Sequence, residues 1–361
     1  MTTPREAGFV MPPEWAAHEG CWMIWPERPD NWRLGAKPAQ RAFAAVAAAI
    51  ARFEPVTMLV SARQFENARA MLPAGVRVVE MSTNDSWARD VGCSFLVGPG
   101  GVLGGVDWPF NAWGGLEGGL YFPWDLDDQV AAKMLELTRG RRFRAPLVME
   151  GGAIHVDGEG TVLMCEECGL NENRNRGVTR ADMERMLGEY LGVNKVIWVE
   201  RGVPGDETNG HIDNLACFAR PGVVLLSWCD DPADPHYEVS RAAEARLAGA
   251  VDARGRALEV VRMPMPAPMA YSAEEAGGID ATASGMSRAA GERLAASYVN
   301  FYMANGAIIA PAFGTETDAP ARDVLARLFP DREVVQVMAR EILLGGGNIH
   351  CITQQQPATT A

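Results

Sequence analysis

The stretch Gly345–Gln356, GGGNIHCITQQQ, places one cysteine, Cys351, after three glycines and inside a short apolar run that is typical of a strand. Because glycine has no Cβ, a backbone or a ligand can come unusually close to it. A cysteine beside such a run is either a reactive thiol or a small core residue, since free cysteines are often simply buried. The remainder of the sequence has to distinguish these two interpretations.

A repeated layout upstream relates this stretch to the rest of the chain. Three times, a polar residue is followed twelve positions later by a hydrophobic strand that begins after a glycine-containing turn. The turns GPGG, DGEG and RPG are typical of hairpins. The three pairs are Asp90 and Val102, Glu150 and Val162, and His211 and Val223.

Helical and strand patterns alternate along the chain, which predicts an α/β protein. A fourth apolar strand, 305–311, follows a long predicted helix over 287–303 but brings no comparable polar residue. Shorter helices are predicted over 39–53, 64–72, 127–138 and 180–191, and strands over 56–60 and 76–81.

Cys351 would be a fifth polar position, but the chain ends before its hairpin strand. The N-terminal run CWMIW, 21–25, is able to supply that strand and so to close a ring of five modules. The alternative is an ordinary α/β sheet in which the spacing is coincidental. We expect a single catalytic domain over 1–361, ordered over about 11–356, with a flexible tail at 357–361.

Composition narrows the class of protein. The 361 residues are 48% hydrophobic and 22% charged, as in ordinary globular proteins. No apolar run is long enough to span a membrane and no secretory signal is visible, so we expect a cytoplasmic protein. Seven scattered cysteines do not form a disulfide pattern. The net charge of −13 disfavours nucleic acid and suits a small cationic substrate.

Five histidines are available to assist a thiolate, and His211 is the best placed. It precedes Asp213 by two residues, so on an extended backbone both side chains project from one face. His350 is adjacent to Cys351, and on a strand their side chains would point in opposite directions. A structural His–Asp pair is the alternative interpretation of His211. The remaining histidines, His18, His155 and His236, show no comparable pattern.

If the modules are arranged radially, these polar positions point to one centre, which would hold Cys351, His211, Asp213, Asp90 and Glu150. Crowded carboxylates repel one another unless a cation joins them. A metal is the weaker choice, because the single CxxC, 165–168, lacks a second pair. A guanidinium is planar, permanently charged and bound bidentately by carboxylates. Its poorly electrophilic carbon needs a thiolate nucleophile, and a histidine can protonate the departing ammonia.

Several motifs together resemble those of the agmatine deiminase family, in the guanidino-group-modifying (pentein) superfamily that includes peptidylarginine deiminase-like proteins. The similarity extends over 11–356. It rests on WPERPDNWR, NDSWARD, FNAWGG, EGGAIH, ETNGHIDN, ARPGVVLLSW, AASYVNFYMANGAIIAP and GGGNIHCITQQQP.

The resemblance implies a five-bladed, pseudo-symmetric α/β propeller of ββαβ-type modules around a central site. It also implies hydrolysis of agmatine to N-carbamoylputrescine and ammonia, in polyamine and putrescine metabolism, without metal or cofactor. The partners would be the cationic substrate and further copies of the chain, with neither nucleic acid nor membrane.

The resemblance further implies a role for each site residue. Cys351 would form a covalent thiouronium intermediate and His211 would shuttle protons. The other implied contacts are Asp90 and Asp213 to guanidinium nitrogens, Glu150 to the guanidinium and His211, Glu207 to the distal ammonium, Trp87 to the channel wall, and Trp113 to the closing loop.

Alternatives stay open at this stage. Related enzymes act on free, methylated or peptidyl arginine, or transfer the amidino group. A substrate with a carboxylate would need an arginine or lysine near its distal end, where the motifs offer Glu207; Arg89, on a strand beside Asp90, would face away. A guanidine-binding protein without activity would need neither Cys351 nor His211. A papain-like hydrolase would have its cysteine before its histidine.

Overall fold

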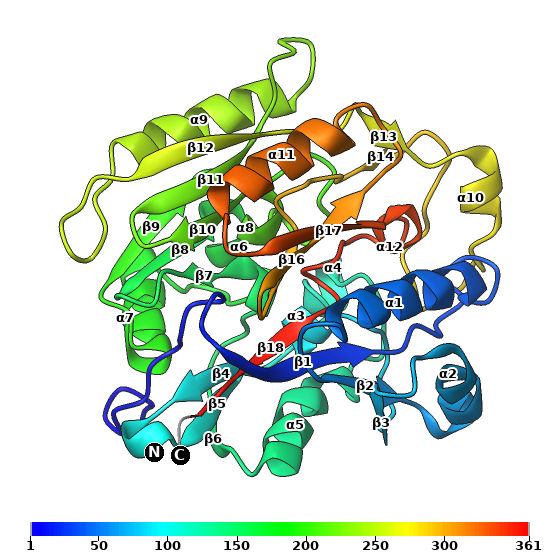
Figure 1. Ribbon diagram of the computed structural model, residues 1–361, viewed down its shortest axis with the longest axis horizontal. Coiled ribbons are helices and arrows are strands. Elements are labelled where there is room, and N and C mark those ends of the chain that lie inside the picture. The colour runs from blue at the N-terminus through cyan, green and yellow to red at the C-terminus, as the bar shows by residue number, and fades with distance from the viewer. Residues whose placement is uncertain (1, 360–361) are drawn as a thin grey trace.

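The computed structural model describes residues 2–359, in which strands and helices alternate (Figure 1). The described residues form five sheets of three or four strands and one two-stranded sheet. The α/β class predicted from the alternating patterns is therefore confirmed. No helix in this part of the chain is long and apolar enough to cross a membrane.

Three sheets share one plan, in which the middle strand is antiparallel to the strand before it and parallel to the strand after it. Each begins after one of the predicted polar positions, so the repeated layout is a repeat of structure. The strands are β4 (Ser94–Val97), β5 (Leu103–Asp107) and β6 (Arg141–Arg144); β7 (His155–Val156), β8 (Thr161–Cys165) and β9 (Lys195–Val199); and β10 (Ala216–Arg220), β11 (Val223–Trp228) and β12 (Glu259–Pro264).

The two remaining large sheets follow the same plan. In one, β16 (Ala307–Ala312) is antiparallel to β15 (Tyr302–Ala304) and parallel to β17 (Glu333–Met338). The other joins the two ends of the chain: β18 (Gln354–Pro357) pairs antiparallel with β1 (His18–Ile24), and β1 continues in parallel to β2 (Val56–Val60) and β3 (Arg77–Glu80).

The pairing of β1 with β18 confirms that the N-terminal strand completes the sheet that begins after Cys351 (Figure 1). Cys21 lies opposite Gln355 in this pair. Strand β18 includes Pro357, so regular structure extends one residue into the expected tail. Residues 360 and 361 of that tail lie outside the described residues.

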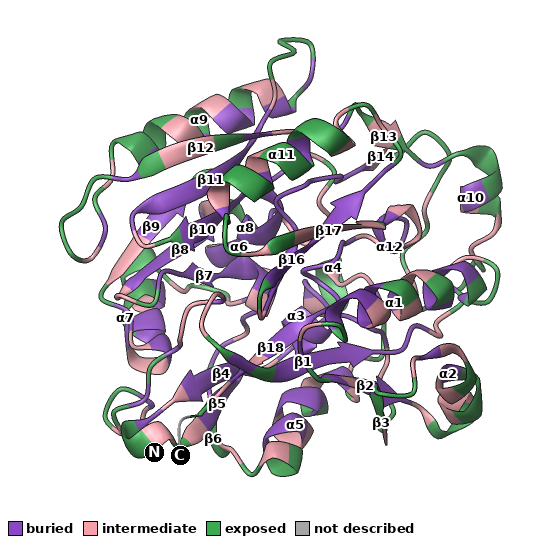
Figure 2. Cartoon of the chain, in the orientation of Figure 1, coloured by how far each residue is buried: buried purple, intermediate pink, exposed green. Residues whose placement is uncertain are grey.

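One helix of each large sheet connects the middle strand to its parallel neighbour, because parallel strands need a crossover. These helices have one buried and one exposed face (Figure 2). They are α1 (Lys37–Ile50), α5 (Val130–Thr138), α7 (Arg180–Leu191), α9 (His236–Ala248) and α11 (Asp318–Leu328).

Shorter elements fill the connections. They are the α-helices α2 (Phe65–Met71), α3 (Ala88–Val91), α4 (Gly115–Gly118), α6 (Glu166–Gly169), α8 (Ile212–Leu215), α10 (Ala273–Gly277) and α12 (Arg340–Leu343), the 3₁₀ turns Ala62–Gln64, Pro99–Gly101, Asp127–Gln129 and Gly151–Ala153, and the small strands β13 (Met269–Ala270) and β14 (Arg293–Leu294).

The helix predicted over 287–303 is wrong. Strand β14 and the start of β15 lie in this segment, and the residues between them form no helix. From Leu294 onward every side chain to Met303 is buried, so the segment has no polar face to present to water as a surface helix would. Gly291, with φ of 87°, interrupts the pattern before it.

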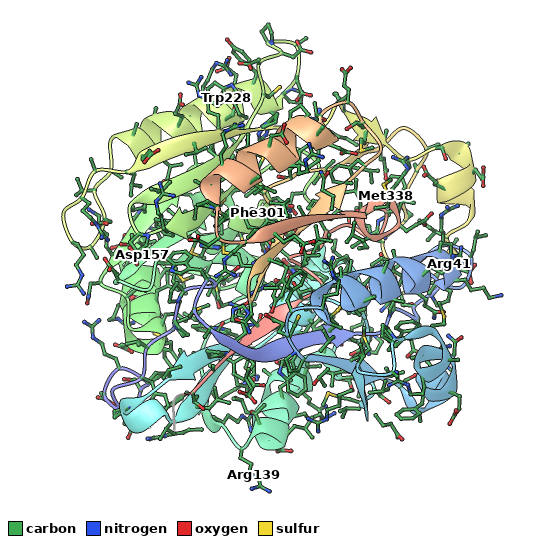
Figure 3. The ribbon with its side chains drawn as sticks, viewed as in Figure 1. Arg41, Arg139, Asp157, Trp228, Phe301 and Met338 are labelled. Atoms are coloured by element: carbon green, nitrogen blue, oxygen red, sulfur yellow. The ribbon has the colours of Figure 1, made fainter. Side chains whose placement is uncertain are left out.

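Apolar residues of the strands form the interior between the sheets and the outer helices. All residues of β8, β11 and β16 are buried, as expected for strands covered on both faces. Phe301 lies in this interior, whereas Arg41 and Arg139 point outward from the helical layer (Figure 3). The residues that precede the first strand of each sheet are largely buried and polar, which positions a site there.

Candidate active site

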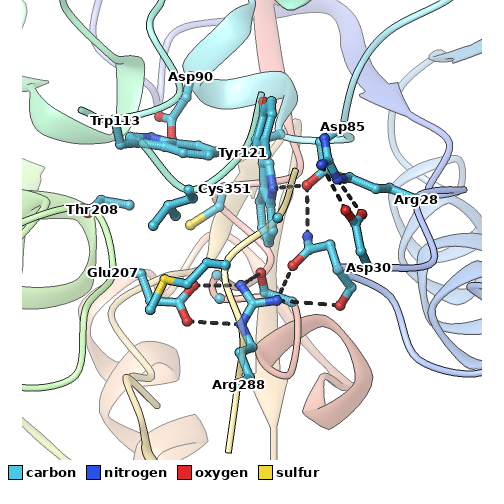
Figure 4. A pocket seen from close by; sticks show the side chains of 18 of the residues that line it. Arg28, Asp30, Asp85, Asp90, Trp113, Tyr121, Glu207, Thr208, Arg288 and Cys351 are labelled. Carbon is cyan, nitrogen blue, oxygen red and sulfur yellow. Dashed lines mark hydrogen bonds and ion pairs between the residues drawn. The ribbon is translucent and has the colours of Figure 1, made fainter. Parts of the chain in front are cut away.

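A pocket opens where the segments before these first strands meet (Figure 4). Asp90, His211 and Cys351 line it, together with Trp87 and Trp113. With Glu207, the structure therefore brings together six of the predicted site residues, although they come from distant segments of the chain. The outer part of the pocket is lined by Arg28, Asp30, Asn31, Asp85, Tyr121, Glu207, Met286 and Arg288, among others.

Cys351 lies in a turn before β18 and is 7% exposed. Two glycines allow close packing beside it. A Cβ on Gly347 would lie 2.5 Å from the Trp87 ring and 3.1 Å from the Cys351 Cβ. Gly346 has φ of 104°, and a Cβ there would meet a Glu207 oxygen at 2.4 Å. The glycine run is thus needed for close approach, as the sequence suggested.

Asp213 and His350 both belong to the surroundings of Cys351. The Cys351 Sγ lies 3.5 Å from Asp213 Oδ2, and the same oxygen lies 2.9 Å from His350 Nδ1. The strand assumed for His350 and Cys351 is wrong, because the two residues lie in a turn; His350 does not line the pocket, yet it contacts the same Asp213 oxygen as Cys351. Asp213 Oδ1 is buried and has no hydrogen-bond partner among the described residues.

Asn300 is a site residue that the sequence reasoning missed. Its Nδ2 lies 3.2 Å from Cys351 Sγ, and its Oδ1 accepts from the backbone N–H of His350 at 2.9 Å. Asn300 precedes β15 as Asp90 precedes β4, so the fourth module does bring a polar residue. The start of β16 follows Asn300 by 7 positions, whereas the middle strands of the other three modules follow their polar residues by 11 to 13, so the twelve-residue interval did not reveal it.

Asp90 lies in the short helix α3, where its two oxygens accept from different segments. Gly152 N–H donates to Oδ1 at 2.8 Å, and Trp113 Nε1 donates to Oδ2 at 3.0 Å. Trp113 adopts φ of 63°, an uncommon conformation for a bulky residue that brings its ring over Asp90. The same helix buries Arg89 away from the pocket, as predicted, although on a helix and not on a strand.

Gly152 marks the point where three site residues meet. A Cβ on this residue would lie 2.5 Å from His211 Nδ1, 2.8 Å from Asp213 Oδ2 and 3.0 Å from Asp90 Oδ1. His211 and Asp213 come here from the start of helix α8, where His211 is the N-cap. Their proximity follows from this helix start and not from the extended backbone that the sequence suggested.

Glu150 supports His211 from outside the pocket. Its Oε2 lies 3.4 Å from His211 Nε2, while Oε1 accepts from Arg174 Nε at 2.7 Å. Glu150 is not among the pocket-lining residues, and Arg174 occupies one of its oxygens. The structure therefore places Glu150 against His211, and its contact with the guanidinium stays a prediction. Arg174 lies in a loop of polar residues, and no sequence pattern there indicated that it would belong to the site.

Cys168 is the second thiol of the site. Its Sγ lies 3.9 Å from Glu150 Oε2, and one ligand atom each of Cys168, Glu150 and His211 lie within 4.8 Å of one another. Of the two cysteines in the CxxC, Cys168 alone joins this group. Burial raises the pKa of the Cys168 thiol, and Arg174 already neutralises Glu150. Neither the raised pKa of the thiol nor the neutralised carboxylate favours binding of a cation here. The absence of a metal stays a prediction.

The protonation states follow from burial and from these contacts. Burial, together with Asp213 and Glu150, raises the pKa of Asp90 to about 6. Burial would also raise the pKa of Glu150, but Arg174 and His211 outweigh it and lower the value to about 2. Burial opposes the charge on His211, yet Asp90 and the other partners raise its pKa well above the usual range. The resting site thus contains a charged histidine.

The surroundings of Cys351 favour the neutral thiol over the thiolate. Burial first, then the charges of Asp213 and Asp90, raise its pKa well above the usual value, and the contact with Asn300 only partly offsets them. A positive charge bound between the carboxylates would have the opposite effect. The geometry therefore couples formation of the thiolate to the arrival of a cation.

The distal end of the pocket differs from the prediction. Glu207 lies there, but its oxygens accept from Arg288 Nε at 2.9 Å and Nη2 at 2.6 Å (Figure 4). Arg28 also lines the pocket and pairs with Asp30. The expectation of a distal end without arginine is therefore wrong, because Arg288 comes from the long loop before β14. Both arginines are neutralised by a carboxylate.

The chain is similar to several known proteins. The family model described as Porphyromonas-type peptidyl-arginine deiminase matches residues 10–357. An agmatine deiminase of Pseudomonas aeruginosa is 58% identical over 359 residues, which cover 99% of this chain and 98% of that protein.

Solved structures show the same similarity. The agmatine deiminase of Enterococcus faecalis superposes with a TM-score of 0.97 at 46% identity, covering 100% of this chain and 99% of that one. A cysteine-to-serine variant of an agmatine deiminase from C. jejuni, with substrate bound, has a TM-score of 0.84 at 26% identity, covering 98% and 97% of the two chains. The family predicted from the motifs is thus confirmed, and the chain belongs to the Porphyromonas-type peptidyl-arginine deiminase family and, within it, to the agmatine deiminases.

Proposed function

We propose that this chain hydrolyses the guanidino group of agmatine to N-carbamoylputrescine and ammonia. The observation that carries the proposal is the thiol of Cys351 beside Asp213, in a pocket that also contains His211 and Asp90. A thiol, an imidazole and carboxylates gathered in one pocket fit a planar cationic substrate. The high identity to curated agmatine deiminases supports the same reaction.

The finer architecture belongs to this proposal. We infer a five-bladed, pseudo-symmetric propeller in which each large sheet is one blade. It is supported by the common strand order of the five sheets and by one polar residue before the first strand of each. These residues are Asp90, Glu150, His211, Asn300 and Cys351.

In the proposed reaction, Asp90 and Asp213 hold the guanidinium nitrogens. Asp213 Oδ1 is free to accept such a bond, and the contacts that Asp90 already makes leave acceptor capacity on its carboxylate. The bound cation stabilises the thiolate of Cys351, so the thiol releases its proton to solvent, and the sulfur then attacks the central carbon. A C–S bond forms and one C=N bond becomes single.

His211 completes both halves of the reaction. As an imidazolium, it donates a proton to the nitrogen that leaves as ammonia, and a thiouronium on Cys351 remains. The neutral imidazole then accepts a proton from water, whose oxygen attacks the same carbon. Breakage of the C–S bond releases the carbamoyl product and the cysteine. Glu150 holds the His211 ring and stabilises its charged form.

The distal ammonium of the substrate meets a balanced set of charges. Glu207 is the carboxylate predicted to meet the amine, but its contact with Arg288 means that an ammonium would share it or displace the arginine. Trp87 and Trp113 line the channel between the two ends and present aromatic surface to the cation. A carboxylated substrate such as arginine would place its negative charge beside Glu207.

A turnover assay tests the proposal. Ammonia and carbamoyl product are measured with agmatine, arginine and a methylated arginine side by side, and agmatine is expected to be the preferred substrate. Cys351→Ser and His211→Ala should each be nearly inactive. Cys229→Ser, which changes a partly exposed cysteine remote from the pocket, serves as the matched control. Unchanged turnover by Cys351→Ser would refute the assignment of the nucleophile.

A further inference from the structure

A buried line of ionisable groups extends behind Cys351, away from the pocket. His350 lies between two carboxylates: its Nδ1 is 2.9 Å from Asp213 Oδ2 and its Nε2 is 2.8 Å from Glu14 Oε1. All three residues are at most 3% exposed. Glu14 comes from the segment that precedes β1, and this segment lies outside the repeated modules.

We propose that His350 is held as an imidazolium between Asp213 and Glu14, and that it positions Asp213 and keeps it ionised for the guanidinium. His350 is then a positioning residue that acts through Asp213, and Glu14 is its second anchor. This inference rests on the function proposed above, because the guanidinium is the ligand of Asp213.

Hydrogen-bond donors decide the charge of His350. An ionised carboxylate only accepts hydrogen bonds, and a neutral imidazole has a single N–H. A neutral His350 would therefore direct a lone pair at one of the two carboxylates, in a buried place where an unsatisfied charged group is costly. The imidazolium donates to both, which matches two distances below 3 Å.

The surrounding charges agree with this state. Arg89 Nη1 lies 3.3 Å from Glu14 Oε1, and its Nε donates to the His350 backbone oxygen at 3.3 Å. His155 Nε2 lies 3.6 Å from the other Glu14 oxygen. Burial and Arg89 would lower the pKa of His350, but Glu14 and Asp213 outweigh them and raise it. Two carboxylates thus face two cations, Arg89 and His350.

The arrangement has two effects on Asp213. His350 contacts Oδ2, the oxygen that also lies beside Cys351, and so fixes the carboxylate, while Oδ1 has no partner among the described residues. Burial would raise the pKa of Asp213, but the contact with His350 outweighs it and lowers the pKa. Without the imidazolium, Asp213 would take up a proton at a higher pH and lose the charge that attracts a guanidinium.

The charge of His350 can be observed directly by NMR with ¹⁵N-labelled histidine, since the chain has only five. We expect one ring, identified by its loss in His350→Gln, to carry protons on both nitrogens at pH 8. In Glu14→Gln, the same ring should become neutral at that pH. A neutral His350 in the unmodified protein at pH 8 overturns the proposal, whatever the protein turns over.

The pH profile of agmatine hydrolysis tests the role. In His350→Gln and Glu14→Gln, the pKa of Asp213 should rise because the cation beside it is lost, and kcat/KM at pH 7 should fall about tenfold, mainly through KM. The activity should recover at pH 9, where Asp213 is ionised again. An equal loss at every pH means a merely structural role and overturns the proposal.

His155→Gln is the matched control. This residue is a buried histidine close to Glu14, with its ring centre 6.4 Å from that of His350, but it does not contact Asp213. It should keep the pH profile of the unmodified protein, and a shifted profile here would count against a specific role of His350.

If His350→Gln does not fold, Glu14→Gln tests the same charge with the ring in place. Absence of agmatine turnover in the unmodified protein would instead refute the proposed function.

Discussion

Replacement of Gly152 by alanine should disable the site with little damage to the fold. The added Cβ would lie 2.5 Å from His211 Nδ1, 2.8 Å from Asp213 Oδ2 and 3.0 Å from Asp90 Oδ1. Since non-bonded heavy atoms need about 3.5 Å, the His211 ring must move by about 1 Å and the two carboxylates by somewhat less. All three are groups that the proposed reaction requires.

The magnitude follows from that displacement. A misplacement of about 1 Å in a catalytic group costs about 100-fold in rate, so kcat/KM for agmatine should fall by about that factor. The extra methyl should lower the free energy of unfolding by about 1–3 kcal/mol, which urea denaturation would show. The N–H of Gly152 that donates to Asp90 remains in the variant.

Gly75→Ala is the control for this experiment, because Gly75 has open space around the position of its Cβ and no left-handed backbone. It should leave both activity and stability nearly unchanged. If Gly152→Ala retained more than about a third of the activity while folded, the three side chains could move freely, and the rigid convergence argued above would be wrong.

Three further outcomes follow from the charges of the site. Because the pKa of Asp90 is raised to about 6, the carboxyl is protonated below that pH and kcat/KM for agmatine should fall there; a profile that stays flat to pH 5 would contradict the assignment. Arg174→Gln leaves Glu150 buried and should lower the free energy of unfolding by about 3–5 kcal/mol in urea, whereas Arg185→Gln, whose ion pair is exposed, should cost less than about 1 kcal/mol. Alkylation of Cys351 in the unliganded protein should accelerate with pH beyond 9, and a plateau near neutral pH would show a thiolate at rest.

The layout of the sheets could be predicted because it depends on local patterns. Apolar runs and glycine-containing turns mark β5, β8 and β11 directly in the sequence. The closing strand β1 could also be predicted, because a regular repeat shows which partner is missing. The segment 287–303 was misassigned because its apolar residues are buried on all sides, and periodicity does not distinguish such a run from a helix.

The histidines show the limit of arguments from spacing. His211 was correctly chosen as a pocket residue, yet it reaches Asp213 through the start of helix α8. His350 was rejected because neighbours on a strand face opposite ways, but it lies in a turn and contacts the same Asp213 oxygen as Cys351. Spacing implies a direction only when the backbone conformation is known.

What the sequence by itself determined is the chemistry: a thiol, an imidazole and carboxylates at repeated positions, in motifs specific enough to identify the family. The tertiary structure decided which partners set their charges. Arg174 pairs with Glu150 and Arg288 pairs with Glu207. Glu14 contacts His350, although the two residues are 336 positions apart in the chain. The physical reason is that reactivity can be recognised in residue types, whereas a pKa depends on burial and on charges within a few ångströms, which distant segments supply only after folding.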